Sequence, residues 1–261
     1  MVMIKKVLMP LPHYGFDPTE VAIPWKILHE NNVAVVFATP DGKKANADET
    51  MLTGKGLGIW KYLLKARQDA VNACKELESS PSFNNPISYK DISYEEYDGL
   101  VLPGGHDKRV KDYLESKVLQ SEVVRFFKAE KAVAAICHGV VVAARSIDAE
   151  TGQSVLYDYK TTSLLQSQEQ AAYNLTRLWM GNYYLTYPEI TVEDEVKSVL
   201  ASIDNFITGP KPLLRDSASN LKRGFVVKDR HYISARWPGD VYNFSFEFLQ
   251  LLHADEYTHD T

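Results

Sequence analysis

The stretch KAVAAICHGVVVAARS, residues 131–146, places a cysteine and a histidine between two different apolar runs. Residues 132–136 form a short, uninterrupted apolar run, which is typical of a buried strand. From Gly139 onward the valines and alanines favour a helix. Cys137 and His138 therefore stand at a sharp turn from strand to helix, where α/β enzymes present a nucleophile above the sheet.

The position of Cys137 at this turn predicts a reactive sulfur. A helix N-terminus carries partial positive charge and offers backbone N–H groups, and both effects favour the thiolate. The N–H of His138 would point toward a developing oxyanion. The alternative is a structural cysteine, because free cysteines are among the most buried residues. The order strand, Cys, His, Gly, helix favours the nucleophile.

Apolar runs of strand length recur along the chain and alternate with helical patterns. Strands are predicted at residues 6–9, 33–38, 100–102, 133–136, 225–227 and 232–234, and helices within 20–31, 116–131, 192–202 and 241–254. Short buried strands that alternate with helices indicate βαβ units and a mostly parallel sheet with helices on both faces. The predicted fold class is therefore α/β, a three-layer sandwich of the flavodoxin-like type.

The segment 43–94 interrupts this alternation. It holds Gly54, Gly56 and Gly58, followed by a helical pattern and a loop-like stretch rich in Ser, Asn and Pro. We interpret the segment as an insertion that caps the sheet, within a single domain that spans residues 1–261.

Composition argues against several classes of protein. The formal net charge is −5, whereas nucleic-acid binding requires clustered Lys and Arg. No window approaches the roughly 18 apolar residues of a membrane span, and Pro10 ends the first apolar run too early for a signal peptide. The two cysteines fit a reducing compartment. We therefore expect a cytoplasmic protein with no nucleic-acid and no membrane partner.

A second glycine-bearing turn ends the predicted strand in YDGLVLPGGHD, residues 97–107. Parallel strands finish at the same edge of a sheet. This turn and the strand-to-helix turn at Cys137, which we call the elbow, can therefore face one crevice. Gly105 would then donate a second N–H to an oxyanion, and Gly104, His106 and His13 could line the substrate site. Solvated loop histidines are the alternative for both His residues. No spacing of His, Cys, Asp and Glu indicates a zinc site.

Together these motifs resemble the ThiJ/PfpI superfamily, within the class I glutamine amidotransferase-like fold. The resemblance is carried in order by FDPTEVAIPW (16–25), YDGLVLPGGHD (97–107) and AVAAICHGVVVAARS (132–146). The later GFVVKDRHYISARWPGD (224–240) resembles the end of members with an added capping segment. The chaperone and glyoxalase III-like branch of the family is the most similar.

The resemblance assigns roles to two acids. The family's acid near the first strand falls on Glu20, where it would approach the cysteine sulfur. Alternatively, Asp17, Pro18 and Glu20 are the N-cap, N1 and N3 residues of a capping box. The branch's third acid falls on Glu169, which would orient His138 as the acid of a triad. The alternative is a surface Glu in the first turn of a helix.

The resemblance implies a cofactor-independent cysteine enzyme that acts on small reactive carbonyls, similar to glyoxalase III, which converts methylglyoxal to lactate. Cys137 would add to the aldehyde, Glu20 or His138 would move the proton, and no metal would take part. The alternatives are a peptide or amide hydrolase and a non-enzymatic redox-sensing or chaperone protein. Amidotransferases use a separate His-x-Glu segment, and the nearest triplet here, residues 253–255, ends in Asp. The family also suggests a homodimer.

Overall fold

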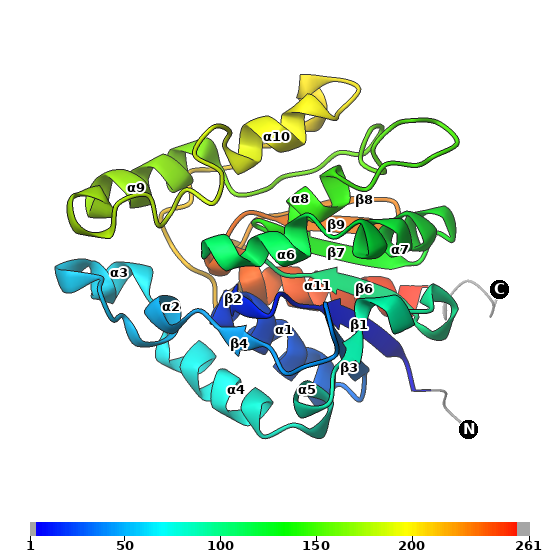
Figure 1. The fold of residues 1–261 in the computed structure, drawn as a ribbon, viewed down its shortest axis with the longest axis horizontal. Coiled ribbons are helices and arrows are strands. Elements are labelled where there is room, and N and C mark those ends of the chain that lie inside the picture. The colour runs from blue at the N-terminus through cyan, green and yellow to red at the C-terminus, as the bar shows by residue number, and fades with distance from the viewer. Residues whose placement is uncertain (1–3, 255–261) are drawn as a thin grey trace.

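A computed structural model describes residues 4–254 of the 261-residue chain. Its centre is a seven-stranded sheet in the order β5-β3-β1-β6-β7-β9-β8 (Figure 1). The strands are β1 (Lys6–Pro10), β2 (Tyr14–Phe16), β3 (Ala34–Thr39), β4 (Asn46–Ala47), β5 (Ile87–Ser88), β6 (Gly99–Leu102), β7 (Ala132–Ile136), β8 (Val226–Asp229) and β9 (Tyr232–Ala235). Within this sheet only β8 runs antiparallel to its neighbour, β9.

Helices cover both faces of the sheet, which confirms the predicted α/β sandwich. They are α1 (Pro18–Glu30), α2 (Glu49–Thr53), α3 (Lys61–Leu64), α4 (Gln68–Glu78), α5 (Pro81–Asn84), α6 (Lys111–Leu114), α7 (Lys117–Lys128), α8 (Gly139–Ala144), α9 (Gln166–Met180), α10 (Val192–Ser198) and α11 (Val241–His253). On one face α1 packs against α4 and α11, and on the other α6, α7 and α8 lie together (Figure 1). None of the described helices combines the length and the hydropathy that crossing a bilayer demands.

The two central strands β6 and β7 are buried along their whole length. Strands buried on both faces read as continuous apolar runs, which is why the sequence located them. They pair in parallel with Leu102 opposite Ala135. Their carboxyl ends therefore finish side by side, and the turn after β6 lies next to the turn after β7.

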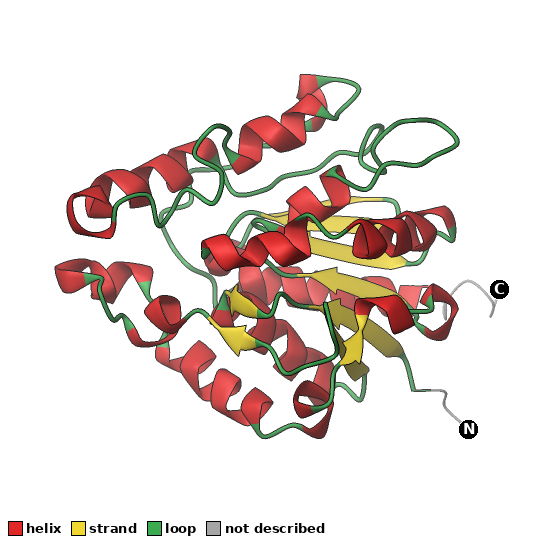
Figure 2. Cartoon of the chain, in the orientation of Figure 1, coloured by secondary structure: helices red, strands yellow, loops and turns green. Residues whose placement is uncertain are grey.

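One part of the segment 43–94 belongs to the layers of the sandwich, and another part lies beyond the carboxyl ends of the strands. The helix α4 packs against α1, and β5 pairs with β3 at the edge of the sheet. Only α2 and α3 extend past the carboxyl ends of the strands, on the side where the strand arrows point in Figure 2. The predicted capping role therefore fits this part of the segment, while the rest belongs to the layers.

A second segment, which the sequence did not indicate as a cap, meets α2 and α3 from above. Met51 and Leu57 from the first segment pack with Tyr184 from the loop after α9. The indole N–H of Trp179 donates to Gly56 O at 2.8 Å, and the Tyr183 hydroxyl donates to Asp48. We call residues 48–64 and 166–191 together the cap.

Candidate active site

The elbow at Cys137 has the backbone geometry that the sequence predicts. Cys137 has a φ of +57°, in the left-handed region that costs a non-glycine residue free energy and that clusters at functional sites. Gly139 follows because nothing larger fits: a Cβ there would lie 2.0 Å from Leu102 O. The helix α8 therefore begins against the end of β6, and this close approach holds Cys137 at the turn.

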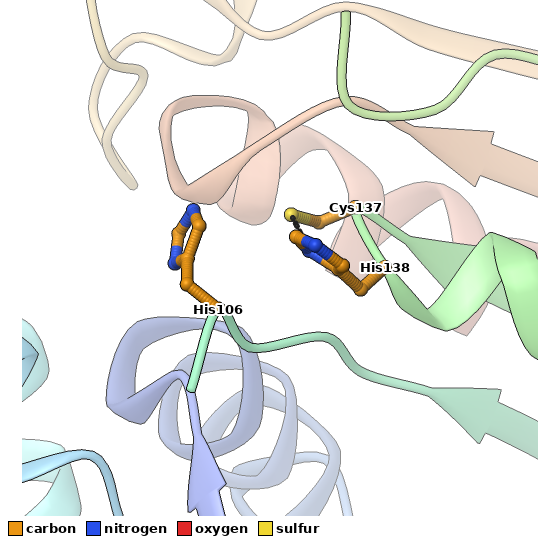
Figure 3. Close-up of side chains that lie close together, drawn as sticks. All are labelled: His106, Cys137 and His138. Carbon is orange, nitrogen blue, oxygen red and sulfur yellow. Dashed lines mark hydrogen bonds between the residues drawn. The ribbon is translucent and has the colours of Figure 1, made fainter. Parts of the chain in front are cut away.

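The His138 ring lies between the thiol and a threonine. Its Nδ1 is 3.5 Å from Cys137 Sγ (Figure 3), and its Nε2 is 3.1 Å from the Thr186 hydroxyl. That hydroxyl donates to His106 O at 2.9 Å, since a carbonyl oxygen can only accept. Nε2 must then carry the proton and donate to Thr186. The lone pair of Nδ1 is left facing the sulfur, where it can accept the thiol proton.

Glu20 lies in the first turn of α1 and is buried beside the turn after β6. Its Oε2 accepts a hydrogen bond from Gly104 N–H at 2.9 Å, and its carboxyl also interacts with the Cys137 thiol. Burial raises the pKa of Glu20 well above its usual range, and the nearby Asp17 charge adds to this effect. A protonated Glu20 can donate a hydrogen bond to sulfur or to a substrate oxygen.

The capping alternative for this turn holds for Asp17. Its side chain accepts from Thr19 N–H at 2.7 Å and from Glu20 N–H at 3.1 Å, and Pro18 begins the helix. Glu20 does not close the box with its own side chain, because that side chain reaches Gly104 instead. Asp17 therefore caps the helix, while Glu20 contacts the turn that follows β6.

The prediction of a resting thiolate at Cys137 is wrong for this conformation. The side chain is fully buried, and burial raises the pKa of the thiol well above its ordinary value, with the charges of Glu20 and Asp17 acting in the same direction. The hydrogen bond from His138 N–H lowers it, but by less. Desolvation is the largest effect on this pKa, and α8 is a short helix of 6 residues. Burial therefore favours the neutral thiol of Cys137 over the thiolate in this conformation.

His106 is part of the site, and the solvated-loop alternative does not hold for it. It is only 9% exposed. Its ring centroid lies 5.3 Å from that of His138 and 5.1 Å from that of Tyr184, both edge to face. His106 and the Tyr184 ring from the cap therefore lie over the elbow, where they can contact a bound substrate.

His13 does not join this group. Its Nδ1 lies 2.6 Å from Asp112 and its Nε2 lies 2.8 Å from Asp41, and the side chain is half exposed. His13 follows the end of β1, and each of its ring nitrogens contacts one acid, Asp112 or Asp41. The structure supports the alternative of a solvated loop histidine, here with a structural role.

Glu169 does not orient His138 in the structure. The carboxylate accepts a hydrogen bond from Val192 N–H at 3.1 Å, at the start of α10, whereas the partner of the imidazole is Thr186. The surface alternative is also wrong, because Glu169 is 2% exposed. Burial raises its pKa to about 7. The residue ties α9, in the second part of the cap, to the start of α10.

The two glycines after β6 are both required by close approach. A Cβ on Gly104 would lie 2.8 Å from His138 N and 3.1 Å from the Cys137 Cβ, and a Cβ on Gly105 would lie 2.2 Å from Gly15 O. Gly104 N–H is engaged by Glu20, and His138 N–H contacts the Cys137 sulfur. Gly105 and, once the sulfur has bonded to a substrate, His138 are the proposed oxyanion donors.

Thr186 and Tyr184 are the site residues that sequence reasoning missed. Both lie in the loop between α9 and α10, which has no periodic pattern and follows a helix rather than a strand. A single Thr or Tyr in such a loop carries no local signal. Only the packing of the cap on the elbow brings these side chains to His138 and His106.

A mostly parallel sheet with a strand–Cys–His–Gly–helix elbow and a buried acid beside the sulfur defines an α/β protein of the nucleophile-elbow class. The family model described as ThiJ/PfpI family-like matches residues 11–210. The chain therefore belongs to the ThiJ/PfpI family, which confirms the resemblance read from its motifs.

Relatives in this family are distant in sequence. The chain is 24% identical over 189 residues to an uncharacterized protein of Schizosaccharomyces pombe, covering 68% of this chain and 69% of that one. It is 24% identical over 172 residues to a deglycase of Thermococcus kodakarensis, covering 65% and 70%. The solved structure of glyoxalase III from Candida albicans superimposes with a TM-score of 0.67 at 16% identity, covering 95% of this chain and 97% of that one. This last likeness shows the shared fold.

Proposed function

We infer that the protein is a cofactor-independent cysteine enzyme of the glyoxalase III type, which converts methylglyoxal to lactate. The observation that carries this proposal is the 3.5 Å separation of Cys137 Sγ and His138 Nδ1, with the tautomer fixed by Thr186. A neutral base in contact with a neutral thiol can generate the nucleophile at the moment of attack. The deglycase and the glyoxalase III among the similar proteins support a carbonyl substrate.

The proposed reaction begins when the Cys137 sulfur bonds to the aldehyde carbon. His138 Nδ1 takes the thiol proton, and the carbonyl electron pair moves to oxygen, where the N–H groups of Gly105 and His138 stabilise the charge. Return of the proton to that oxygen gives a hemithioacetal. Glu20 or His138 then moves a proton from the first carbon to the second through an enediol, leaving a thioester. Water hydrolyses the thioester to lactate and frees the thiol.

The cap decides when this can happen. Cys137 is fully buried, and five surface cavities formed by the described residues are lined by residues other than Cys137. Its surroundings are polar side chains, Glu20, His106 and His138, rather than hydrocarbon alone. We propose that the cap opens to admit the carbonyl and closes to exclude water.

Burial of the thiol disfavours the redox-sensing alternative, because oxidation follows thiolate character and exposure. For the amide hydrolase alternative, His253 is the last residue of α11 and Asp255 lies outside the described residues. No feature of the described residues specifically favours the redox-sensing or the amide hydrolase alternative.

The test is to incubate the full chain with methylglyoxal, without added thiol, and to measure lactate. We expect turnover that Cys137→Ala abolishes and Cys74→Ala retains, because Cys74 lies in α4, outside the site. Lactate formation by Cys137→Ala at the wild-type rate would refute the proposal.

A further inference from the structure

Three potential metal ligands from two different strand ends meet at the elbow. One ring nitrogen of His106, one of His138 and the sulfur of Cys137 all lie within 4.8 Å of one another (Figure 3). We propose that these three side chains form a binding site for a single transition-metal ion, with Zn²⁺ the best match. Such an ion would inhibit attack of the Cys137 sulfur on a carbonyl. The site stands on geometry and would exist whether or not the chain turns over a carbonyl.

The spacing of two ligands already suits a shared ion. Zinc binds sulfur at about 2.3 Å and imidazole nitrogen at about 2.0 Å with tetrahedral angles, so the two donor atoms lie roughly 3.6 Å apart. Cys137 Sγ and His138 Nδ1 are separated by 3.5 Å. The separation of these two atoms therefore already matches that of two ligands of one zinc ion. A ring nitrogen of His106, which lies within 4.8 Å of both other ligand atoms, would complete the set by moving closer to them.

The surroundings of His138 resemble those of a metal ligand. A ligating imidazole ordinarily donates its other N–H to a fixed acceptor, which sets its tautomer and orientation. Here Nε2 donates to the Thr186 hydroxyl, which in turn donates to His106 O. Thr186 thus orients one histidine through its ring and fixes the other through its backbone.

His106 supplies an independent observation. The residue is only 9% exposed, and its Nδ1 is buried without a hydrogen-bond partner. An unpaired polar atom inside a protein costs free energy. Neither the edge-to-face contacts with His138 and Tyr184 nor any other contact of the described residues satisfies this nitrogen. Coordination of an ion by the His106 ring would account for a histidine at this position.

The donor set selects the class of ion. One thiolate and two imidazoles suit Zn²⁺ and other borderline or soft ions, whereas Mg²⁺ and Ca²⁺ prefer oxygen. Three protein ligands leave one position open to water. Binding converts the thiol to a metal thiolate and releases one proton to solvent, so the affinity should increase with pH. Coordination lowers the nucleophilicity of the sulfur relative to a free thiolate, and a chelator should restore it.

The test is to titrate the metal-free full chain with Co²⁺, whose thiolate complexes absorb light, and then to displace it with Zn²⁺. We expect one ion per chain, a thiolate-to-cobalt charge-transfer band, and loss of that band on adding one equivalent of Zn²⁺. Cys137→Ala should abolish the band. His106→Phe keeps an aromatic ring against Tyr184 and should weaken Zn²⁺ binding at least tenfold.

Two matched controls separate this site from others. Cys74→Ala removes the other thiol, and His13→Asn removes the histidine held between Asp41 and Asp112. Both should bind the ion as the wild type does. Binding that survives Cys137→Ala, or that depends on His13, would overturn the proposal.

A measurement on the unmodified chain covers the case in which a variant fails to fold. Zn²⁺ should slow alkylation of Cys137 at least tenfold, as followed by mass spectrometry of its peptide, and should leave Cys74 unchanged. Equal rates with and without the ion would also overturn the proposal. These readouts need no turnover, so a chain that binds Zn²⁺ but makes no lactate refutes only the proposed reaction.

Discussion

The Nε2 of His138 lies 3.1 Å from the Thr186 hydroxyl, which itself donates to a backbone carbonyl. These two hydrogen bonds fix which ring nitrogen of His138 carries the proton. In a Cys-His-acid triad the acid has this role. Thr186 fills this role without adding a negative charge. The imidazolium formed during a reaction therefore gains less electrostatic stabilisation than a carboxylate would give it, and burial lowers the pKa of His138 well below its usual range.

The first prediction concerns this hydroxyl. Thr186→Val keeps the shape of the side chain but removes the acceptor for Nε2, leaving a buried N–H unpaired at a cost of about 1–3 kcal/mol. We expect turnover of methylglyoxal to fall roughly 5- to 150-fold, since about 1.4 kcal/mol corresponds to a factor of ten. Thr186→Ser should retain most of the activity. Wild-type turnover in Thr186→Val would show that the tautomer is fixed by something else.

The second prediction concerns the protonation of Cys137. Because burial raises the pKa of the thiol, its alkylation by iodoacetamide should be slow at pH 7 and should continue to increase above pH 9. The measurement is the rate of modification of the Cys137 peptide across this pH range. A plateau reached below pH 8 would mean that the sulfur is a thiolate at rest after all.

The third prediction concerns the cap. Trp179→Phe and Tyr183→Phe together remove two hydrogen bonds that join its two parts, to Gly56 O and to Asp48. Each such bond contributes about 1 kcal/mol, so alkylation of Cys137 should accelerate roughly tenfold or more in the double variant. The global melting temperature should change little if opening is local.

A matched control for this experiment lies outside the cap. Tyr159→Phe removes a tyrosine hydroxyl that contacts His231 at 3.2 Å. His231 directly precedes β9, at the end of the sheet opposite to the site. Tyr159→Phe should leave the alkylation rate of Cys137 as it is. If the double cap variant behaves like Tyr159→Phe, then the cap does not gate the thiol.

The fourth prediction concerns the pH dependence of stability. The pKa of Glu169 is raised to about 7 in the folded chain, so its contribution is fully present below the unfolded pKa and is lost as the pH increases toward 7. The loss is on the order of 3 kcal/mol for the difference between the folded and unfolded pKa values. Glu169→Gln cannot ionise and should be more stable relative to wild type at pH 8 than at pH 5.

The measurement is urea unfolding of both proteins at the two pH values. Asp216, whose pKa burial also raises to about 7, contributes equally to both and cancels in the comparison. An equal difference in unfolding free energy at pH 5 and pH 8 would show that Glu169 ionises normally in the folded chain.

Much of the fold could be predicted because its signals are local. The strands β1, β6 and β7 are short runs buried on both faces, and the amphipathic helices between them have clear periodicity. The elbow was visible for the same reason, since Cys137 separates two such patterns and Gly139 follows. The two-residue strand β5 was not, because its pairing with β3 rather than its own composition defines it.

The rest of the site depends on contacts between distant segments. The pKa of Cys137 is raised by burial and by the charges of Glu20 and Asp17, which come from another part of the chain, so the helix N-terminus alone does not predict the protonation state. Glu169 was assigned through a family position, yet the chain turns its carboxylate toward Val192. Likewise, His106, Cys137 and His138 have no spacing typical of metal ligands, and it is the pairing of β6 with β7 that brings them together.

The strand β9 lies beside β7, although it comes from near the end of the described chain, and Cys137 N–H donates to Ala235 O at 3.1 Å. A nascent chain emerging from the ribosome therefore exposes this sulfur long before its last strand can dock. During that interval the thiol is open to solvent oxidants and to other proteins. The surroundings that bury the sulfur in the folded protein are therefore complete only after β9 has docked beside β7.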